Sequence, residues 1–213
     1  MYFMDLWQKK SPGPDSLRPQ VLIHLAMNIM QYILIIYKAC IALHFTPTSW
    51  KNSTIIFIPK PGKTTYTDPK SYRPISLSKY LLKALEKLCV WNTEEILETN
   101  PLSTQQHGFQ RGKCTESAIS KTTNFIEQNL DKNKHCLAVF LDIKGAFDTI
   151  CPKYIKKSLK AKGINKDLVE WYYNYITHRN IEFKDNNFEI TGTIDIGFPQ
   201  GGVCSEEVLD HCI

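Results

Sequence analysis

One short segment constrains the fold more than any other part of the chain: five consecutive apolar residues at 137–141, followed at once by Asp142. A continuous apolar run of this length is typical of a strand covered on both faces, which requires a sheet with further structure on each side. Such a strand presents its final carboxylate where the sheet meets solvent, a common position for a metal ligand. The same aspartate also fits a turn or a helix N-cap, so both roles stay open.

The remainder of the chain mixes helical and strand patterns. Apolar spacing predicts helices at 21–45, 81–88, 119–130, 153–161 and 167–176, with Gly163 placed to end one of them. Strand patterns occur at 53–59, in a hairpin over 181–190 that turns at 185–187, and at 193–196. Because strands and helices do not alternate strictly, the predicted fold class is α+β.

Composition excludes several classes of protein. With 213 residues, 43% of them hydrophobic, the chain is expected to form a real core. Its seven cysteines never form a C-x-x-C pair, which argues against a disulfide scaffold or a zinc ribbon and fits a reducing compartment. No signal-peptide pattern opens the chain, and polar residues interrupt 21–45 before it reaches the roughly 18 apolar residues of a membrane span. We therefore expect an intracellular protein, in the cytoplasm or nucleus, with no membrane partner.

Positive charge is concentrated between residues 51 and 90. Eight lysines and arginines against two acidic residues give this stretch more positive charge than the whole chain, whose net charge is +5. The second half of the stretch fits the solvated face of a helix. The first half sets Lys60, Lys63, Lys70 and Arg73 among prolines and a glycine, where a stiff loop would hold cations against phosphate oxygens.

Seven short blocks follow one another in order between about Lys10 and Ser205. They are Lys-Ser-Pro-Gly-Pro-Asp at 10–15, Trp-Lys at 50–51, Ile-Pro-Lys-Pro-Gly-Lys at 58–63, Tyr-Arg-Pro-Ile-Ser-Leu at 72–77, Gln-His-Gly-Phe at 106–109, the segment around Asp142, and Gly-Phe-Pro-Gln-Gly-Gly-Val at 197–203. In this order they resemble the reverse transcriptase domain of a non-LTR retrotransposon of the Jockey-like kind. The resemblance implies a right-hand polymerase fold and an RNA-directed DNA polymerase, with an RNA template, a DNA primer and a dNTP as partners.

The resemblance also implies a metal site. In such polymerases two divalent cations, Mg²⁺ or Mn²⁺, are held by carboxylates, activate the primer 3′-hydroxyl and neutralise charge on the phosphates. Asp142 matches the first metal-binding and catalytic aspartate, and the main-chain carbonyl of Ile143 would be a further ligand. Phe147 matches the aromatic residue that crowds a ribose 2′-hydroxyl and so favours deoxynucleotides. From the residues alone, Phe147 fits a core aromatic behind the strand equally well.

Nucleotide contacts are implied at four further positions. Arg73 matches the fingers arginine that meets the incoming triphosphate, and Lys60 and Lys63 are candidate phosphate or template contacts. Gln200 matches the Pro-Gln-Gly element beside the nucleotide sugar, and the glycines after it are expected to let a nucleic-acid strand approach. The simpler alternatives are a surface ion pair for Arg73 and a plain turn around Gln200. Asp148 is expected to have a structural or helix-capping role.

Two features depart from the family pattern. After Val203 the usual Ser-Pro pair and apolar helix are replaced by a segment with two adjacent glutamates, and no Tyr/Phe-x-Asp-Asp hairpin occurs before Ile213. We therefore expect an N-terminal helix and fingers region over 1–134, a partial palm over 135–213 without a thumb, and no polymerisation by this chain alone. The strand before Asp142 would keep an unpaired, aggregation-prone edge. The alternatives are a non-catalytic nucleic-acid-binding remnant that uses the basic stretch, and a helical interaction protein.

Overall fold

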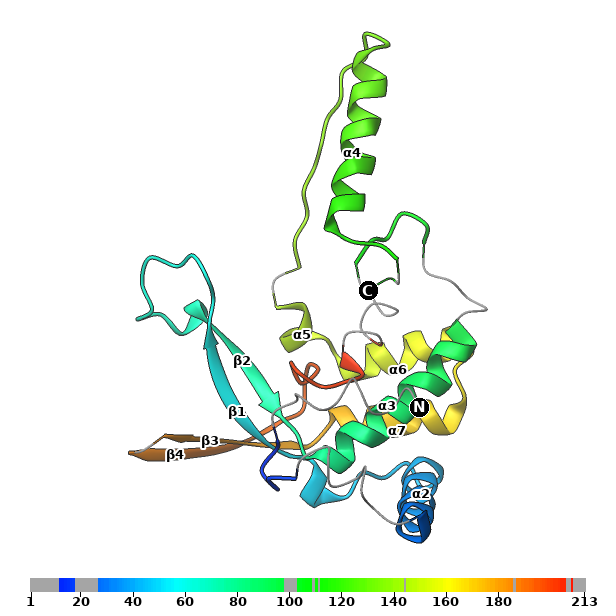
Figure 1. Cartoon of the computed structure of the whole chain (residues 1–213), viewed down its shortest axis with the longest axis vertical. Coiled ribbons are helices and arrows are strands. Elements are labelled where there is room, and N and C mark those ends of the chain that lie inside the picture. The colour runs from blue at the N-terminus through cyan, green and yellow to red at the C-terminus, as the bar shows by residue number, and fades with distance from the viewer. Residues whose placement is uncertain are drawn as a thin grey trace.

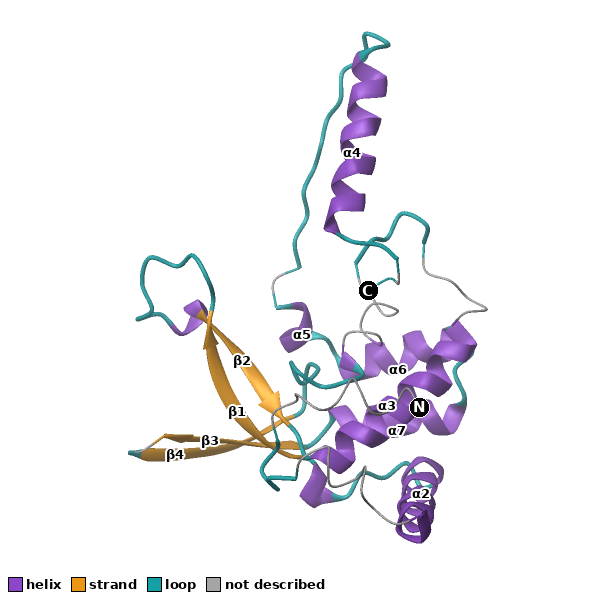
Figure 2. Ribbon diagram, in the orientation of Figure 1, coloured by secondary structure: helices purple, strands orange, loops and turns teal. Residues whose placement is uncertain are grey.

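The computed structural model describes residues 12–17, 27–97, 103–108, 110, 112–143, 145–185, 187–205 and 208. A four-stranded sheet lies to one side of a group of helices, and one helix stands apart from both (Figures 1 and 2). This arrangement confirms the predicted α+β class. Within the described part of the chain, no helix combines the length and the apolarity needed to cross a bilayer.

The sheet has the strand order β2-β1-β3-β4. Its strands are β1 (Asn52–Pro59), β2 (Tyr72–Leu77), β3 (Arg179–Asp185) and β4 (Phe188–Ile194). β1 pairs antiparallel with β2 but parallel with β3, so the sheet joins segments that are far apart in the sequence. The predicted strand at 53–59 and the predicted hairpin are confirmed. The separate strand predicted at 193–196 is wrong, because its first residues continue β4.

All five predicted helices occur. They are α2 (Met27–Ala42), α3 (Tyr80–Leu97), α4 (Thr115–Leu130), α6 (Pro152–Ala161) and α7 (Lys166–Ile176); shorter elements are α5 (Ala146–Thr149), η1 (Thr48–Trp50) and η2 (Pro69–Ser71). The predicted beginning of the first helix lies outside the described residues, so only its part from Met27 is tested. Gly163, at φ +77°, follows α6 and donates its N–H to the carbonyl of Lys160, as expected for a residue that ends a helix.

The hydrophobic core lies where α3, α6 and α7 meet. Its largest fully buried side chains include Trp171, Tyr172 and Tyr175 of α7, together with Leu85 of α3 and Leu159 of α6. The rings of Trp171 and Tyr175 stack at 5.4 Å between centroids. α2 packs against α7 from the outside. α6 and α7 therefore bury their apolar faces in this core, whereas of the predicted α3 face Leu81, Leu85 and Leu88 only Leu85 is fully buried.

The segment that leads to Asp142 differs most from the prediction. α4 buries none of its residues, and the chain returns from its far end to α5 as an extended segment (Figure 1). Leu137 and Phe140 are 92% and 91% exposed. The predicted strand over 137–141 is therefore wrong for this structure: a strand needs a neighbour to bond its N–H and C=O groups, and no described residue supplies one. We call α4 together with 131–143 the arm.

Candidate functional site

A cleft of about 750 Å³ opens between the sheet and α5. Four of the predicted site residues line it: Lys60 at the end of β1, Arg73 on β2, Phe147 on α5 and Gln200 in the loop after β4. These residues come from segments far apart in the sequence. The fold therefore brings together side chains whose proximity no local pattern could establish.

One wall of this cleft is positively charged. Lys60, Lys70 and Arg73 line it, whereas Asp148 is the one acidic side chain among its described lining residues. The ammonium group of Lys60 donates to the main-chain carbonyl of Lys70 at 2.8 Å, which closes the loop between β1 and β2. Lys70 belongs to the group of loop cations that the sequence predicts to meet phosphate, although it is not one of the nucleotide contacts implied by the family resemblance. Cations gathered around one cleft favour a ligand that carries phosphate.

α5 presents Phe147 to the cleft and to the core at once. The side chain lines the cleft and packs against the buried cluster. A place in the core and a place beside a bound nucleotide are therefore compatible for Phe147. Its carbonyl accepts the N–H of Phe198 at 2.7 Å. Asp148 accepts a hydrogen bond from the side-chain amide of Gln200 at 3.1 Å, while Gly145 occupies the N-cap of α5. The carboxylate of Asp148 therefore orients the glutamine; it does not cap the helix.

The loop at 196–205, which we call the Pro-Gln-Gly loop, is bonded to the elements on either side of the cleft. The carbonyl of Gln200 accepts the N–H of Ser76 on β2 at 2.7 Å, and Gly197 donates to the carbonyl of Ile150 at 2.9 Å. Gly201 has φ +95°, and a Cβ there would lie 3.0 Å from Cγ2 of Ile75. The absence of a side chain at Gly201 thus lets the loop approach β2 closely.

Three predicted site residues do not line the cleft. Lys63 is exposed in the loop between β1 and β2, and Asp142 and Ile143 are exposed at the end of the arm. Gly145 does line the cleft, so the arm ends beside it. The structure therefore groups Lys60, Arg73, Phe147 and Gln200 in the cleft. The predicted metal ligands, Asp142 and Ile143, lie outside its lining.

Among the residues that the structure describes, no three His, Cys, Asp or Glu side chains are grouped so that they could hold a metal ion. Asp142 and the Ile143 carbonyl would supply one carboxylate and one neutral carbonyl oxygen. Two divalent cations about 4 Å apart repel each other and are held by several carboxylates in two-metal enzymes. These two donors by themselves do not fit such a site.

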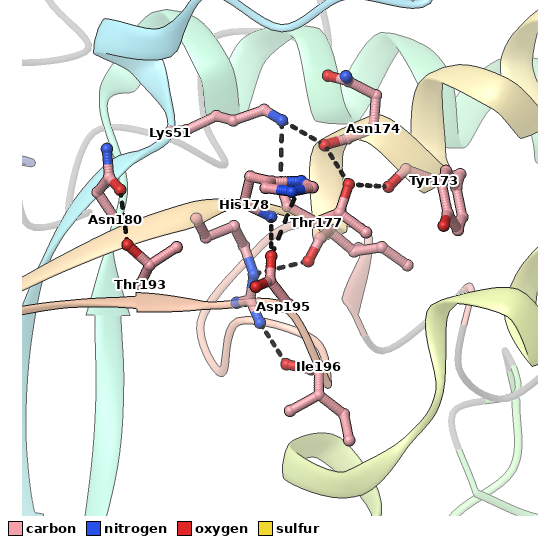
Figure 3. Close-up of polar contacts among 11 residues, drawn as sticks. Lys51, Tyr173, Asn174, Thr177, His178, Asn180, Thr193, Asp195 and Ile196 are labelled. Atoms are coloured by element: carbon pink, nitrogen blue, oxygen red, sulfur yellow. Dashed lines mark hydrogen bonds and ion pairs between the residues drawn. The ribbon is translucent and has the colours of Figure 1, made fainter.

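Two cations of the basic stretch belong to the interior. Lys51 is 7% exposed, and its ammonium group donates to the carbonyls of Asn174 and Thr177 at the end of α7 (Figure 3). Burial, reinforced by the nearby Arg179, lowers the pKa of Lys51. Lys83 is 6% exposed. The predicted basic stretch is therefore not one continuous surface, and the charge at the cleft comes from β2 and the loop that precedes it.

The chain matches known proteins over most of its length. Residues 58–210 match the family model described as reverse transcriptase (RNA-dependent DNA polymerase). The probable RNA-directed DNA polymerase from transposon BS of Drosophila melanogaster is 34% identical over 202 residues, which are 92% of this chain and 22% of that protein. The RNA-directed DNA polymerase from mobile element jockey of the same species is 32% identical over 143 residues, 67% of this chain and 16% of that protein. The chain thus spans about a fifth of the length of these relatives.

A solved structure of apo telomerase from Candida tropicalis aligns with a TM-score of 0.46 and 13% identity, over 86% of this chain and 43% of that one.

The family match includes the blocks at 58–63, 72–77, 106–109 and 197–203 and the segment around Asp142. It also extends past the departure at residue 204, where Cys204 and Val208 are buried in the core. The chain therefore belongs to the reverse transcriptase (RNA-dependent DNA polymerase) family, and within it to the polymerases of non-LTR retrotransposons such as jockey.

Proposed function

We propose that this chain is the part of an RNA-directed DNA polymerase that holds the incoming dNTP against the template and primer. The observation that carries the proposal is the cleft that gathers Lys60, Arg73, Phe147 and Gln200. Cations suit a triphosphate, because charge-assisted hydrogen bonds to phosphate oxygens are short and strong. The ring of Phe147 and the amide of Gln200, on the opposite wall, suit the sugar and the base.

Reverse transcriptases in general act on an RNA template, a DNA primer and dNTPs, and depend on a divalent metal ion. We propose the same partners for this chain, Mg²⁺ or Mn²⁺ as the cofactor, Asp142 and the Ile143 carbonyl as ligands that act with carboxylates beyond the described residues, and a location in the cytoplasm or nucleus. Membership of the family supports these proposals.

The division into a helix-and-fingers region at 1–134 and a partial palm at 135–213 also stays a proposal. β1 pairs with β3 across this boundary, and the core combines Leu85 with Trp171. The two regions would therefore be functional parts that share one core. A linker does not separate them in the described part of the chain, and we expect them to unfold together.

Nucleotide binding tests the cleft directly. We expect Arg73→Ala, in the full chain with Mg²⁺ present, to weaken dNTP affinity by roughly ten- to a hundredfold, because a hydrogen bond to a charged group is worth about 1.5–3 kcal/mol. Lys121→Ala is the matched control, since it removes one exposed positive charge from α4, away from the cleft. The proposal fails if neither variant weakens binding, or if both weaken it equally. Lys63→Ala, measured beside them, decides whether that lysine reaches the ligand.

The alternative is a non-catalytic nucleic-acid-binding role that uses the basic residues of the cleft; the family match does not favour it, and one measurement separates it from the first proposal. It predicts that the chain binds a primed RNA template with an affinity that falls steeply as salt rises, yet incorporates no dNTP. Incorporation with Mg²⁺ or Mn²⁺ is the deciding measurement. Incorporation that disappears in Asp142→Ala would exclude this second candidate and establish Asp142 as catalytic.

A further inference from the structure

A buried arginine holds the beginning of the Pro-Gln-Gly loop. Arg179, the first residue of β3, is 8% exposed. Its guanidinium donates to the carbonyl of Ile196 at 2.7 Å and to that of Gly197 at 3.0 Å. Its Nε donates to the carbonyl of Ile176 at the end of α7, which fixes the direction of the side chain. Figure 3 shows the Ile196 carbonyl turned back towards the start of β3.

A buried glutamate holds the other end of the same loop. Glu86, in the middle of α3, is 0% exposed, and its Oε2 accepts the main-chain N–H groups of Val203 and, at 3.4 Å, of Cys204. The N–H of Val208 donates to the carbonyl of Cys204, so a helical turn begins at this point. The first N–H groups of a helical turn lack partners within it, and a carboxylate satisfies them well.

Burying two charges is costly unless hydrogen bonds compensate, so their positions are informative. Burial raises the pKa of Glu86, and the N–H groups of Val203 and Cys204 counteract that rise. Both side chains bond to the main chain of one loop: Arg179 donates to carbonyl groups at its beginning, and Glu86 accepts from N–H groups at its end. Between those ends, Gln200 is fixed again, through its carbonyl to Ser76 and through its amide to Asp148. Neither Arg179 nor Glu86 lines the cleft.

We infer that Arg179 and Glu86 are positioning residues, which clamp the Pro-Gln-Gly loop at its two ends and thereby hold Gln200 at the cleft wall. This inference rests on the proposed function only for its effect on dNTP affinity. The clamp itself is a statement about the order of the loop in the free chain, and it can be measured without any ligand.

Hydrogen exchange in the full, ligand-free chain tests the clamp. Glu86→Gln keeps the size of the side chain but removes the charge, and we expect the amides of 197–205 to exchange roughly tenfold faster, as befits a weakened charge-assisted hydrogen bond. Arg179→Lys is expected to do the same at Gly197 and Phe198; Pro199 has no amide N–H. Lys51→Met is the matched control, because it removes another buried charged side chain, one that bonds the end of α7 and not the loop. Unchanged exchange of the loop in Glu86→Gln, or equal acceleration in Lys51→Met, would overturn the inference.

A double-substitution comparison tests whether Glu86 acts through Gln200. We expect Glu86→Gln to weaken dNTP binding about fivefold in the wild-type background but hardly at all in Gln200→Ala, because coupled residues give non-additive effects. Losses that simply add would show that Glu86 does not act through Gln200 and would overturn this role. A wild-type chain that binds no dNTP would contradict the proposed function, while the exchange experiment would still decide on the clamp.

Discussion

The Pro-Gln-Gly loop and the arm show opposite relations between regular structure and order. The loop has almost no helix or strand, yet its residues Phe198 and Cys204 are 2% and 0% exposed and its main chain bonds to α3, α5, β2 and β3. The arm contains the 16-residue helix α4 and buries none of that helix. What fixes a segment in this molecule is therefore burial and bonding to distant elements, and not its own secondary structure.

The comparison separates two kinds of apolar residue as well. Leu85, in the core beneath the loop, is 0% exposed, whereas Leu130, at the far end of α4, is 54% exposed. The two residues have the same side chain and both lie in helices. Any difference in their contribution to stability therefore reports the surroundings and not the residue type.

The largest expected effect is that of Leu85→Ala, which should lower the free energy of unfolding by about 2–5 kcal/mol through lost burial and an unfilled cavity. Leu130→Ala should cost at most about 0.5 kcal/mol. Urea unfolding of both variants, followed by circular dichroism, measures the difference. Comparable losses would mean that the arm is packed as firmly as the core, and the contrast between the regions would be lost.

A smaller effect is expected at two glycines that both have a positive φ. Gly201 in the loop has φ +95° and lies against β2, while Gly112, which precedes the arm helix, has φ +77° and nothing within 4 Å of its Cβ position. At both positions the positive φ strains an alanine, which should lower the free energy of unfolding by about 1 kcal/mol. Gly201→Ala should cost about 1–2 kcal/mol more, because overpacking is added. Thermal unfolding checks this, and equal destabilisation would show that the loop yields to the added methyl group.

The helices around the core could be predicted because their signals are local. The spacing of Leu168, Trp171, Tyr172 and Tyr175 defines the buried face of α7, and Gly163 marks the end of the preceding helix. The parallel pairing of β1 with β3 and the assembly of the cleft could not be predicted, because they depend on which distant segments meet. The family resemblance supplied Arg73 and Gln200, which no pattern within the chain could have grouped.

The prediction of a strand over 137–141 was wrong because it, too, depended on which distant segments meet. Its apolar run shows that the residues favour burial, but burial also needs neighbours, and the described residues provide none. Glu86 was missed although a signal exists: it lies on the helical stripe formed by Leu82, Cys89 and Thr93, all of which are buried. A glutamate on an otherwise uncharged stripe indicates a buried carboxylate that must have a partner.

A partly buried ion pair between α6 and α7, away from both the loop and the arm, gives a smaller expected effect. Glu170 of α7 bonds to Lys156 and Lys160 of α6, and the hydrogen bond from Lys156 above all lowers the pKa of the carboxyl below its ordinary 4.5. Because the pKa of Glu170 is lower in the folded state than in the unfolded chain, its carboxylate stabilises the fold at pH values above the unfolded pKa. That contribution disappears as the pH falls through the folded pKa. Glu170→Gln should therefore cost at most about 1 kcal/mol at pH 7 and progressively less as the pH falls below 4.5, measured by urea unfolding. A cost that persists at low pH would assign the effect to packing.

The smallest change in stability, and the clearest change in surface behaviour, is expected in the arm. Phe140→Ser and Leu141→Ser alter side chains that are 91% and 92% exposed, so the free energy of unfolding should change by less than about 0.5 kcal/mol. Because the same side chains form an apolar patch beside unpaired main-chain groups, the double variant should bind less of an apolar fluorescent dye and scatter less light on standing. Phe198→Ser, in the loop, is the matched comparison: it should lose stability and bind more dye, since a buried side chain is removed. If the arm variant instead loses stability as Phe198→Ser does, the arm is packed against the body in solution, and the ordering of the two regions by burial is wrong.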